Sequence, residues 1–289
     1  MNKKVAALVI LYHYTLDNIN DIRTYACQVE KVYCFDNTEN IDKILKEKLE
    51  QIENVEYYSQ SENIGLTIAI NRIAKIAIKE GYNWLFTFDQ DSRASENMVQ
   101  KMVHFIDEYE EAENVGIIAP VVSDGKVEFG IPVSRYSFYD RVIQSGAMHN
   151  LNVLQDIGGY DEKLFIDQVD LEYCIRLIQN GYKIIRLSDA VLLHNSEDEN
   201  TYVRYVNGKK LTINKYSPIR YYYIIRNNLY CGKIYKNVFR PYYAETKRNI
   251  EMRWKTIPYE KQKIKKIKAI MCGYLDFLLS RMGKCKWHL

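Results

Sequence analysis

Apolar runs and helix-spaced runs alternate through the first two thirds of the chain, and this alternation constrains the fold more than any other feature. The run at residues 5–12 is apolar throughout, which is typical of a central strand in a parallel sheet. Strand-like runs recur at residues 31–35, 55–58, 84–88, 115–119, 142–148 and 183–187. Helical spacing lies between them, at 19–30, 41–52, 67–79, 97–109 and 169–180. This order predicts an α/β fold built on a doubly wound, mostly parallel sheet.

Outside these runs the pattern weakens or changes. Residues 121–141 contain scattered Gly and Pro, which predicts loops and a hairpin. From Pro218 onward the pattern is helical and rich in Tyr and Lys. Because 47% of the residues are apolar, the chain can bury a substantial core. The six cysteines form no CxxC pair, which argues against a zinc site and favours reduced thiols in the cytosol.

Polar clusters follow three of the predicted strands. Asp36-Asn37-Thr38 comes after the second strand, Asn63-Ile64-Gly65 after the third and Asp89–Ser92 after the fourth. The carboxyl ends of parallel strands meet at one edge of a sheet, and ligands of such sheets bind there. We therefore expect the three clusters to line one binding site.

The cluster Asp89-Gln90-Asp91 carries the clearest chemistry. Two carboxylates one residue apart at a strand exit can approach the same cation, and Mg²⁺ or Mn²⁺ prefers such oxygen ligands. A cation held there would neutralise the charge of a diphosphate leaving group. The alternative is a solvated turn, because the pattern is common by chance.

Phe88–Ser92 resembles the hallmark segment of family 2 glycosyltransferases of the rhamnosyltransferase type. Other segments resemble the same family in the expected order, namely 9–13, 36–38, 62–66 with Asn71, 145–147, 158–162, 164–170, 216–218, 226–228, 273–276 and 283–284. The resemblance covers nearly the whole chain.

The resemblance implies a GT-A fold and an inverting glycosyltransferase that depends on Mg²⁺ or Mn²⁺. It implies a nucleotide-sugar donor, foremost dTDP-L-rhamnose, and a growing surface polysaccharide or lipid-linked glycan as acceptor. Another donor, such as a UDP-hexose, stays open. The catalytic domain would span residues 1–215, with a nucleotide-binding half at 1–120 and an acceptor-binding half at 121–215. Residues 216–289 would form a basic, Tyr-rich helical extension.

The family pattern also assigns roles to single residues. Asp91 would be the main metal ligand, assisted by Asp89 and His194. The donor would be bound by Tyr12, Asp36, Asn63, Gly65, Asp89, Gln90, Ser145 and Gly146. Three alternatives stay open: Asp36 could cap the following helix, Asn63 and Gly65 could serve only their turn, and His194 could be a partly buried histidine satisfied by the backbone. His149 is a weaker candidate for facing the donor sugar.

Inversion by direct displacement requires a general base on the acceptor hydroxyl. Many family 2 enzymes have Glu-Asp at this place, but this chain has Asp167-Gln168, and Gln168 cannot act as a base. The role therefore passes to Asp167 or Asp170, with Asp167 favoured. Either carboxylate could instead stabilise a helix start, where negative charge meets the helix dipole favourably.

The C-terminal part is strongly basic although the net charge of the chain is only +3. From Lys233 to the end, fifteen Lys and Arg residues stand against four Asp and Glu. Residues 264–278 have an apolar face at helical spacing with lysines beside it, which is typical of an element on a membrane surface. The same face could pack on the catalytic domain or on a second copy in a homodimer. Nucleic acid is not expected as a partner, because the basic stretch matches no known module.

The run at residues 5–12 is too short to span a bilayer, so we expect a cytoplasmic protein that rests on the inner face of the plasma membrane. Two functions of other classes fit the sequence less well. A nucleotidyltransferase would have a Gly-rich loop after its first strand, and Leu11–Tyr14 contains no glycine. A non-catalytic glycan-binding scaffold has no physical reason to retain Asp89, Asp91, Asp167 and Asp170 together.

Overall fold

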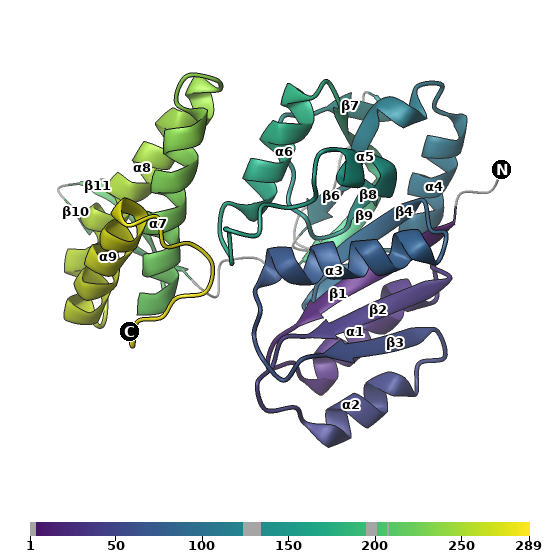
Figure 1. Ribbon diagram of the computed structural model, residues 1–289, viewed down its shortest axis with the longest axis horizontal. Coiled ribbons are helices and arrows are strands. Elements are labelled where there is room, and N and C mark those ends of the chain that lie inside the picture. Colours follow the sequence, from purple (N-terminus) through teal and green to yellow (C-terminus); the bar gives the residue numbers. More distant parts are fainter. Residues whose placement is uncertain (1–3, 124–133, 195–200, 207) are drawn as a thin grey trace. The chain divides into compact units, whose positions relative to one another are not determined.

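The computed structural model describes residues 4–123, 134–194, 201–206 and 208–289. The chain forms two compact units, Met1–Asp161 with Tyr173–Asn195, and Glu162–Glu172 with Ser196–Leu289. The first is an α/β unit and the second is mainly helical (Figure 1). The predicted domain division at residues 215 and 216 stays a prediction.

The first unit is organised around one mixed sheet, in which β1 (Val5–Leu11) lies between β2 (Lys31–Asp36) and β4 (Trp84–Asp89). The strand order is β3 (Val55–Ser59), β2, β1, β4, β8 (Ala147–Asn150), β6 (Val115–Ser123), β9 (Lys183–His194) and β5 (Ser92–Ala94), with β7 (Tyr136–Phe138) paired to β9. Strands β1 to β4 are parallel, as are β6 and β9, whereas β8 runs antiparallel to both β4 and β6. The predicted fold class is confirmed.

Helices cover both faces of this sheet. They are α1 (Leu16–Ala26), α2 (Lys43–Glu50), α3 (Leu66–Lys79), α4 (Met98–Glu108), α5 (Leu151–Asp156) and α6 (Val169–Gln179), with a 3₁₀ turn at Ala112–Asn114. Asp42 caps α2 by accepting the N–H groups of Ile44 and Leu45. Figure 1 shows α3 crossing in front of β1.

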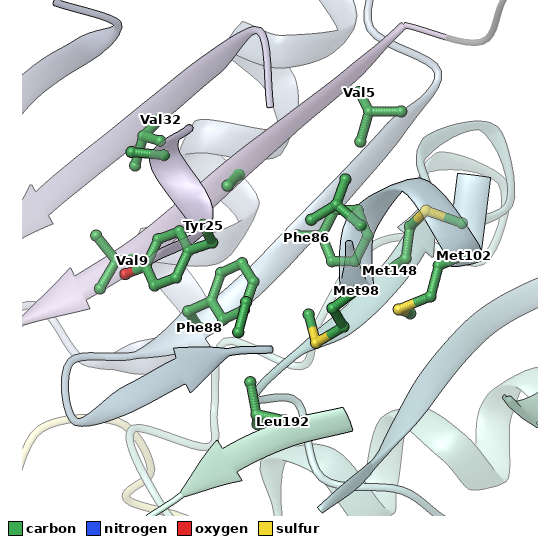
Figure 2. Close-up of a cluster of buried hydrophobic side chains, with 14 of the residues drawn as sticks. Val5, Val9, Tyr25, Val32, Phe86, Phe88, Met98, Met102, Met148 and Leu192 are labelled. Atoms are coloured by element: carbon green, nitrogen blue, oxygen red, sulfur yellow. The ribbon is translucent and has the colours of Figure 1, made fainter. Parts of the chain in front are cut away.

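The main core lies between the sheet, α1 and α4. Alternate residues of β1, among them Val5 and Val9, join this cluster, as the period of two in a strand requires. Figure 2 shows Tyr25 of α1 beside Phe88 of β4, whose rings are stacked with centroids 3.9 Å apart. This contact fixes the end of β4 immediately before Asp89.

The second unit contains α7 (Pro218–Tyr235), α8 (Arg240–Thr256), α9 (Lys263–Leu278), a 3₁₀ turn at Ile257–Tyr259, and a hairpin of β10 (Thr201–Val206) and β11 (Lys209–Asn214). Its core explains the many tyrosines, because Tyr221 and Tyr222 are buried and bind buried charges. Tyr222 donates to Asp276 Oδ2 at 2.8 Å, and Tyr221 donates to Glu260, which is paired with Lys266. Among the described residues, none of the helices is long and apolar enough to cross a membrane.

Several details differ from the predicted elements. The strand expected at 142–148 is wrong, because Gln144–Gly146 forms a turn and the strand begins only at Ala147. The strand ending at 187 continues to His194 as β9, and the β10–β11 hairpin was not predicted. Within 121–141, β6 runs on to Ser123 and β7 pairs with β9, while residues 124–133 lie outside the described residues.

Candidate active site

The carboxyl ends of β1, β2 and β4 are tied together by hydrogen bonds from the backbone. The N–H of Tyr12 donates to Gln90 Oε1 at 2.8 Å, and the N–H of His13 donates to Thr38 Oγ1 at 2.9 Å. The ring of Tyr12 is 44% exposed, which leaves it available to a ligand. The sheet edge predicted from the polar clusters is therefore formed, with Tyr12 and Gln90 in contact.

Asp36 stabilises the turn that follows β2 at this edge of the sheet. Its side chain is fully buried, with Oδ1 accepting the N–H of Thr38 at 2.8 Å and Oδ2 accepting the hydroxyl of Tyr57 at 2.6 Å. The alternative that Asp36 caps the following helix is wrong, because α2 begins at Lys43 and Asp42 caps it. Asp36 instead fixes the turn that carries Thr38.

Asn63 and Gly65 are held in place by Asn37, which belongs to a predicted polar cluster but was not among the predicted donor-binding residues. Asn37 accepts the N–H of Ile64 at 3.2 Å and donates to the carbonyl of Gly65 at 3.3 Å. Asn63 Oδ1 accepts the N–H of Gly65 at 3.0 Å. Gly65 has a φ of 88° and immediately precedes α3, so its lack of a Cβ permits this turn. The arrangement places the N-terminus of α3 at the same edge, where helix geometry favours anions.

Asp89 is surrounded by the turn that precedes β8. Gln144 donates to Asp89 Oδ1 at 3.0 Å, and the N–H of Asp89 donates to Ser145 Oγ at 3.0 Å. Ser145 is fully buried. Gly146 has a φ of 75°, and a Cβ there would lie 2.9 Å from Pro120 Cγ. Ser145 and Gly146 thus act on the site through the placement of Asp89, and Gln144 is a partner that the sequence did not reveal.

His194 reaches the Asp89-Gln90-Asp91 segment because β5 pairs with β9, with Ser92 opposite His194. Ser92 Oγ lies 2.8 Å from His194 Nδ1 and 2.7 Å from Ser145 Oγ. One ligand atom from each of Asp89, Asp91 and His194 lies within 4.8 Å of the others. The three residues predicted as metal ligands are therefore brought together.

The chemistry of this cluster fits a divalent cation. Two carboxylates and one imidazole are competent ligands of Mn²⁺, and the carboxylates also suit Mg²⁺. All three residues are half-buried, which leaves coordination positions open to phosphate oxygens or water. Ser92, next to Nδ1 of His194, would orient the imidazole, as hydrogen-bond partners commonly do for histidines that bind metals.

His149 belongs to the core and not to the site. It is fully buried in β8, with its ring nitrogen Nε2 3.0 Å from Thr87 Oγ1. Burial lowers the pKa of His149 to about 3, so the ring is neutral at physiological pH. The suggestion that His149 faces the donor sugar is wrong.

Asp167 lies in the second unit, in an ion pair with Arg220 of α7. Arg220 Nη2 donates to Asp167 Oδ1 at 2.8 Å, and Nε lies 2.8 Å from Oδ2. Burial raises the pKa of the Asp167 carboxyl, while Arg220 opposes that rise. Both oxygens of this carboxylate face the same guanidinium.

The backbone that leads into α6 has an unusual conformation. Asp167 and Gln168 have φ angles of 68° and 65°, in the left-handed region that residues other than glycine rarely adopt. Asn227 Nδ2 donates to the carbonyls of Ile166 at 2.6 Å and Asp167 at 3.2 Å, and the hydroxyl of Tyr242 donates to Gln168 Oε1 at 2.5 Å. These contacts from α7 and α8 hold the strained segment.

Asp170 lies in the first turn of α6 and is half-buried. The dipole of α6 favours its negative charge there. Asp167 precedes the helix and Asp170 stands inside it, so neither occupies the N-cap position itself.

Comparison with known proteins points to one family. Residues 13–153 match the model of glycosyl transferase family 2. A curated dTDP-rhamnosyl transferase, RfbF from Shigella flexneri, is 29% identical over 248 residues, which are 78% of this chain and 79% of that protein.

Solved structures share the fold. Residues 1–349 of TarS from S. aureus match at a TM-score of 0.56 and 16% identity, over 96% of this chain and 80% of that structure. GalNAc-T7, solved with UDP, GalNAc and Mn²⁺, matches at a TM-score of 0.55 and 12% identity, over 86% of this chain. The match covers 54% of the GalNAc-T7 chain, so the present chain spans about half of its length.

Proposed function

Because the chain is a glycosyltransferase of family 2, we propose that it transfers L-rhamnose from dTDP-L-rhamnose to a hydroxyl of a glycan acceptor. The 29% identity to a protein named as a dTDP-rhamnosyl transferase supports this donor. The acceptor is a growing surface polysaccharide or a lipid-linked glycan.

The observation that carries the proposal is the gathering of Asp89, Asp91 and His194 at the edge of the sheet. These residues would hold Mg²⁺ or Mn²⁺, which would supply charge neutralisation for a diphosphate leaving group.

The donor lies along the same edge. Tyr12 offers an exposed ring to the nucleotide, and Gln90 fixes the backbone of Tyr12. The turn at Asn63 and Gly65 lines the pocket with backbone groups, while Asp36 holds the neighbouring turn. Ser145 and Gly146 shape the sugar side through Asp89 and the adjoining backbone.

The reaction is a single displacement with inversion at the anomeric carbon. A carboxylate takes the proton from the acceptor hydroxyl, the hydroxyl oxygen bonds to the anomeric carbon, and the bond to the diphosphate breaks. We assign the base to Asp170 and not to Asp167, which the sequence favoured, because Arg220 faces both oxygens of the Asp167 carboxylate and stabilises its ionised form. Asp167 then serves as a positioning residue.

We also propose that the enzyme works in the cytoplasm, at the inner face of the plasma membrane. No disulfide joins any of the six cysteines, all of which lie among the described residues. This is the state expected of thiols in a reducing compartment.

A binding screen tests the proposed donor. The melting temperature would be measured with dTDP, UDP or GDP and with their sugars, each with and without Mn²⁺. We expect the largest stabilisation from dTDP-L-rhamnose with Mn²⁺, and its loss in Asp91→Asn, since a ligand stabilises the state to which it binds. Stabilisation by UDP-sugars alone would replace rhamnose with a UDP-hexose. That donor is the second candidate, because TarS was solved with UDP-GlcNAc.

A further inference from the structure

The outward face of α9 is an apolar stripe. Its members are Ile264, Ile267, Met271, Leu275 and Leu278, all of which are exposed. Their spacing of three or four residues puts them in one row along the helix. Ile264 is 85% exposed and Leu278 is 74% exposed, so the row is not the face that packs into the helical unit.

The inward face of α9 is already occupied. Ala269, Ile270 and Gly273 are buried in the core of the second unit, and a Cβ on Gly273 would lie 2.9 Å from the carbonyl oxygen of Tyr222. The helix therefore has its packing face on one side and an additional apolar row on the other. Contiguous apolar surface of this kind marks an interaction site.

Only positive charges accompany the stripe on the exposed surface of α9. Lys263, Lys265 and Lys268 are exposed. The one acidic residue of the helix, Asp276, is buried and accepts hydrogen bonds from Tyr222 and Trp287. An apolar row between cations is complementary to a surface with apolar depth and negative headgroups.

A cleft of about 490 Å³ lies beside the stripe. It is lined by Lys265, Lys268, Trp287, His288 and Leu289. The Nζ of Lys268 donates to the carbonyl of His288 at 3.0 Å, which holds the end of the chain against the helix. The cleft thus combines two ammonium groups with an indole, side chains that are favoured at the headgroup level of membranes.

We propose that α9 and this cleft form a docking surface for an anionic lipid bilayer, with α9 lying in the plane of the interface. The apolar stripe enters the acyl boundary, and the lysines bind headgroup phosphates. A second copy of the chain fits less well, because a symmetric contact would bring the lysines of both copies together. This inference does not depend on the identity of the donor sugar.

Co-sedimentation with vesicles tests the apolar part. Wild-type protein should bind vesicles of phosphatidylcholine with phosphatidylglycerol and should not bind phosphatidylcholine alone. The double variant Ile264→Ser with Leu278→Ser should bind at least about tenfold more weakly, because it removes two large apolar side chains from the interface. Ile44→Ser is the matched control, because Ile44 is 67% exposed on α2 of the first unit, and it should bind as the wild type does.

A charge variant and a mass measurement complete the test. Lys265→Gln with Lys268→Gln should weaken binding to anionic vesicles about tenfold or more, and added salt should have the same effect. Circular dichroism should show that all variants are folded. Equal binding by the stripe variant and the Ile44→Ser control would overturn the proposal. So would a dimer in solution that becomes a monomer in the stripe variant, because the stripe would then be covered by a second copy.

Discussion

Arg220 holds both carboxylate oxygens of Asp167, at 2.8 Å each. The pair lies at a segment whose backbone is left-handed at two consecutive residues, Asp167 and Gln168. Such conformations persist only where neighbouring groups over-determine them. The ion pair is therefore part of the support that sets where α6 begins, and with it the position of Asp170.

Substituting Asp170 and Asp167 one at a time distinguishes the general base from the positioning residue. Asp170→Asn should lower kcat by about 10²–10⁴-fold, the contribution typical of a general base. Asp167→Asn should lower kcat less, because its carboxylate already binds Arg220. Both variants should bind the donor as the wild type does. The measurement is kcat with saturating donor, beside donor affinity from calorimetry.

The variant Arg220→Met provides the control for this assignment. If Asp167 only positions the segment, Asp167→Asn and Arg220→Met should each lower kcat, and the double variant should be no worse than the poorer single one. Near-normal turnover in Asp170→Asn together with an inactive Asp167→Asn would return the role of base to Asp167.

Ser92 should control metal affinity without binding the metal. Ser92→Ala removes the hydroxyl that lies 2.8 Å from His194 Nδ1, and we expect Mn²⁺ affinity to fall about 10–100-fold, as for other outer partners of histidine ligands. His194→Gln should weaken Mn²⁺ further. Ser137→Ala, at an exposed position of β7, is the control and should leave the affinity unchanged. Titration with Mn²⁺ in the presence of dTDP measures all three, and unchanged affinity in Ser92→Ala would contradict the prediction.

The sheet could be predicted because its central strands are buried on both faces and so appear as continuous apolar runs. Ala6 to Val9 are fully buried, for example. The β5–β9 pairing could not be predicted, because Ser92–Ala94 is too short to show a period. His194 was accordingly placed near Asp91 by family resemblance alone.

The partners that support the site were missed for a related reason. Gln144 reaches Asp89 across 55 residues, and Arg220 reaches Asp167 across 53. Neither contact has a local pattern, since it depends on which turns and helices pack together. Reactive residues that directly follow a strand, such as Asp89-Gln90-Asp91, can be predicted from the sequence. The distant residues that orient their side chains cannot.

Substitution of Gly159 should lower the stability of the protein, because a Cβ there would lie 2.6 Å from Asn71 Oδ1. Asn71 uses that oxygen to accept the N–H of Tyr160 at 2.8 Å and donates to the Tyr160 carbonyl at 2.9 Å. Gly159→Ala should therefore lower the free energy of unfolding by about 3 kcal/mol, the sum of left-handed strain and a broken buried hydrogen bond. Chemical denaturation measures the change.

Gly158→Ala is the matched control for this substitution. Gly158 has a φ of 84°, close to the 75° of Gly159, but nothing lies within 4 Å of its added Cβ. Only the backbone strain remains, so the loss should be about 1–2 kcal/mol. Equal losses in the two variants would mean that the contact with Asn71 contributes nothing.

His149 should make the protein sensitive to acid. Burial holds its pKa at about 3 in the folded state, against 6.5 for the free side chain. The unfolded chain therefore takes up a proton below pH 6.5 while the folded chain does not. The contribution of neutral His149 to the free energy of unfolding is thus fully present above pH 6.5 and is lost as the pH falls towards 3. At pH 5 the loss should be about 2 kcal/mol in the free energy of unfolding.

Denaturation at pH 7.5 and pH 5 should show this difference in the wild type and a smaller one in His149→Gln. His104→Gln, at an exposed histidine, should retain the full difference. A His149→Gln profile parallel to that of the wild type would assign the acid sensitivity to other groups.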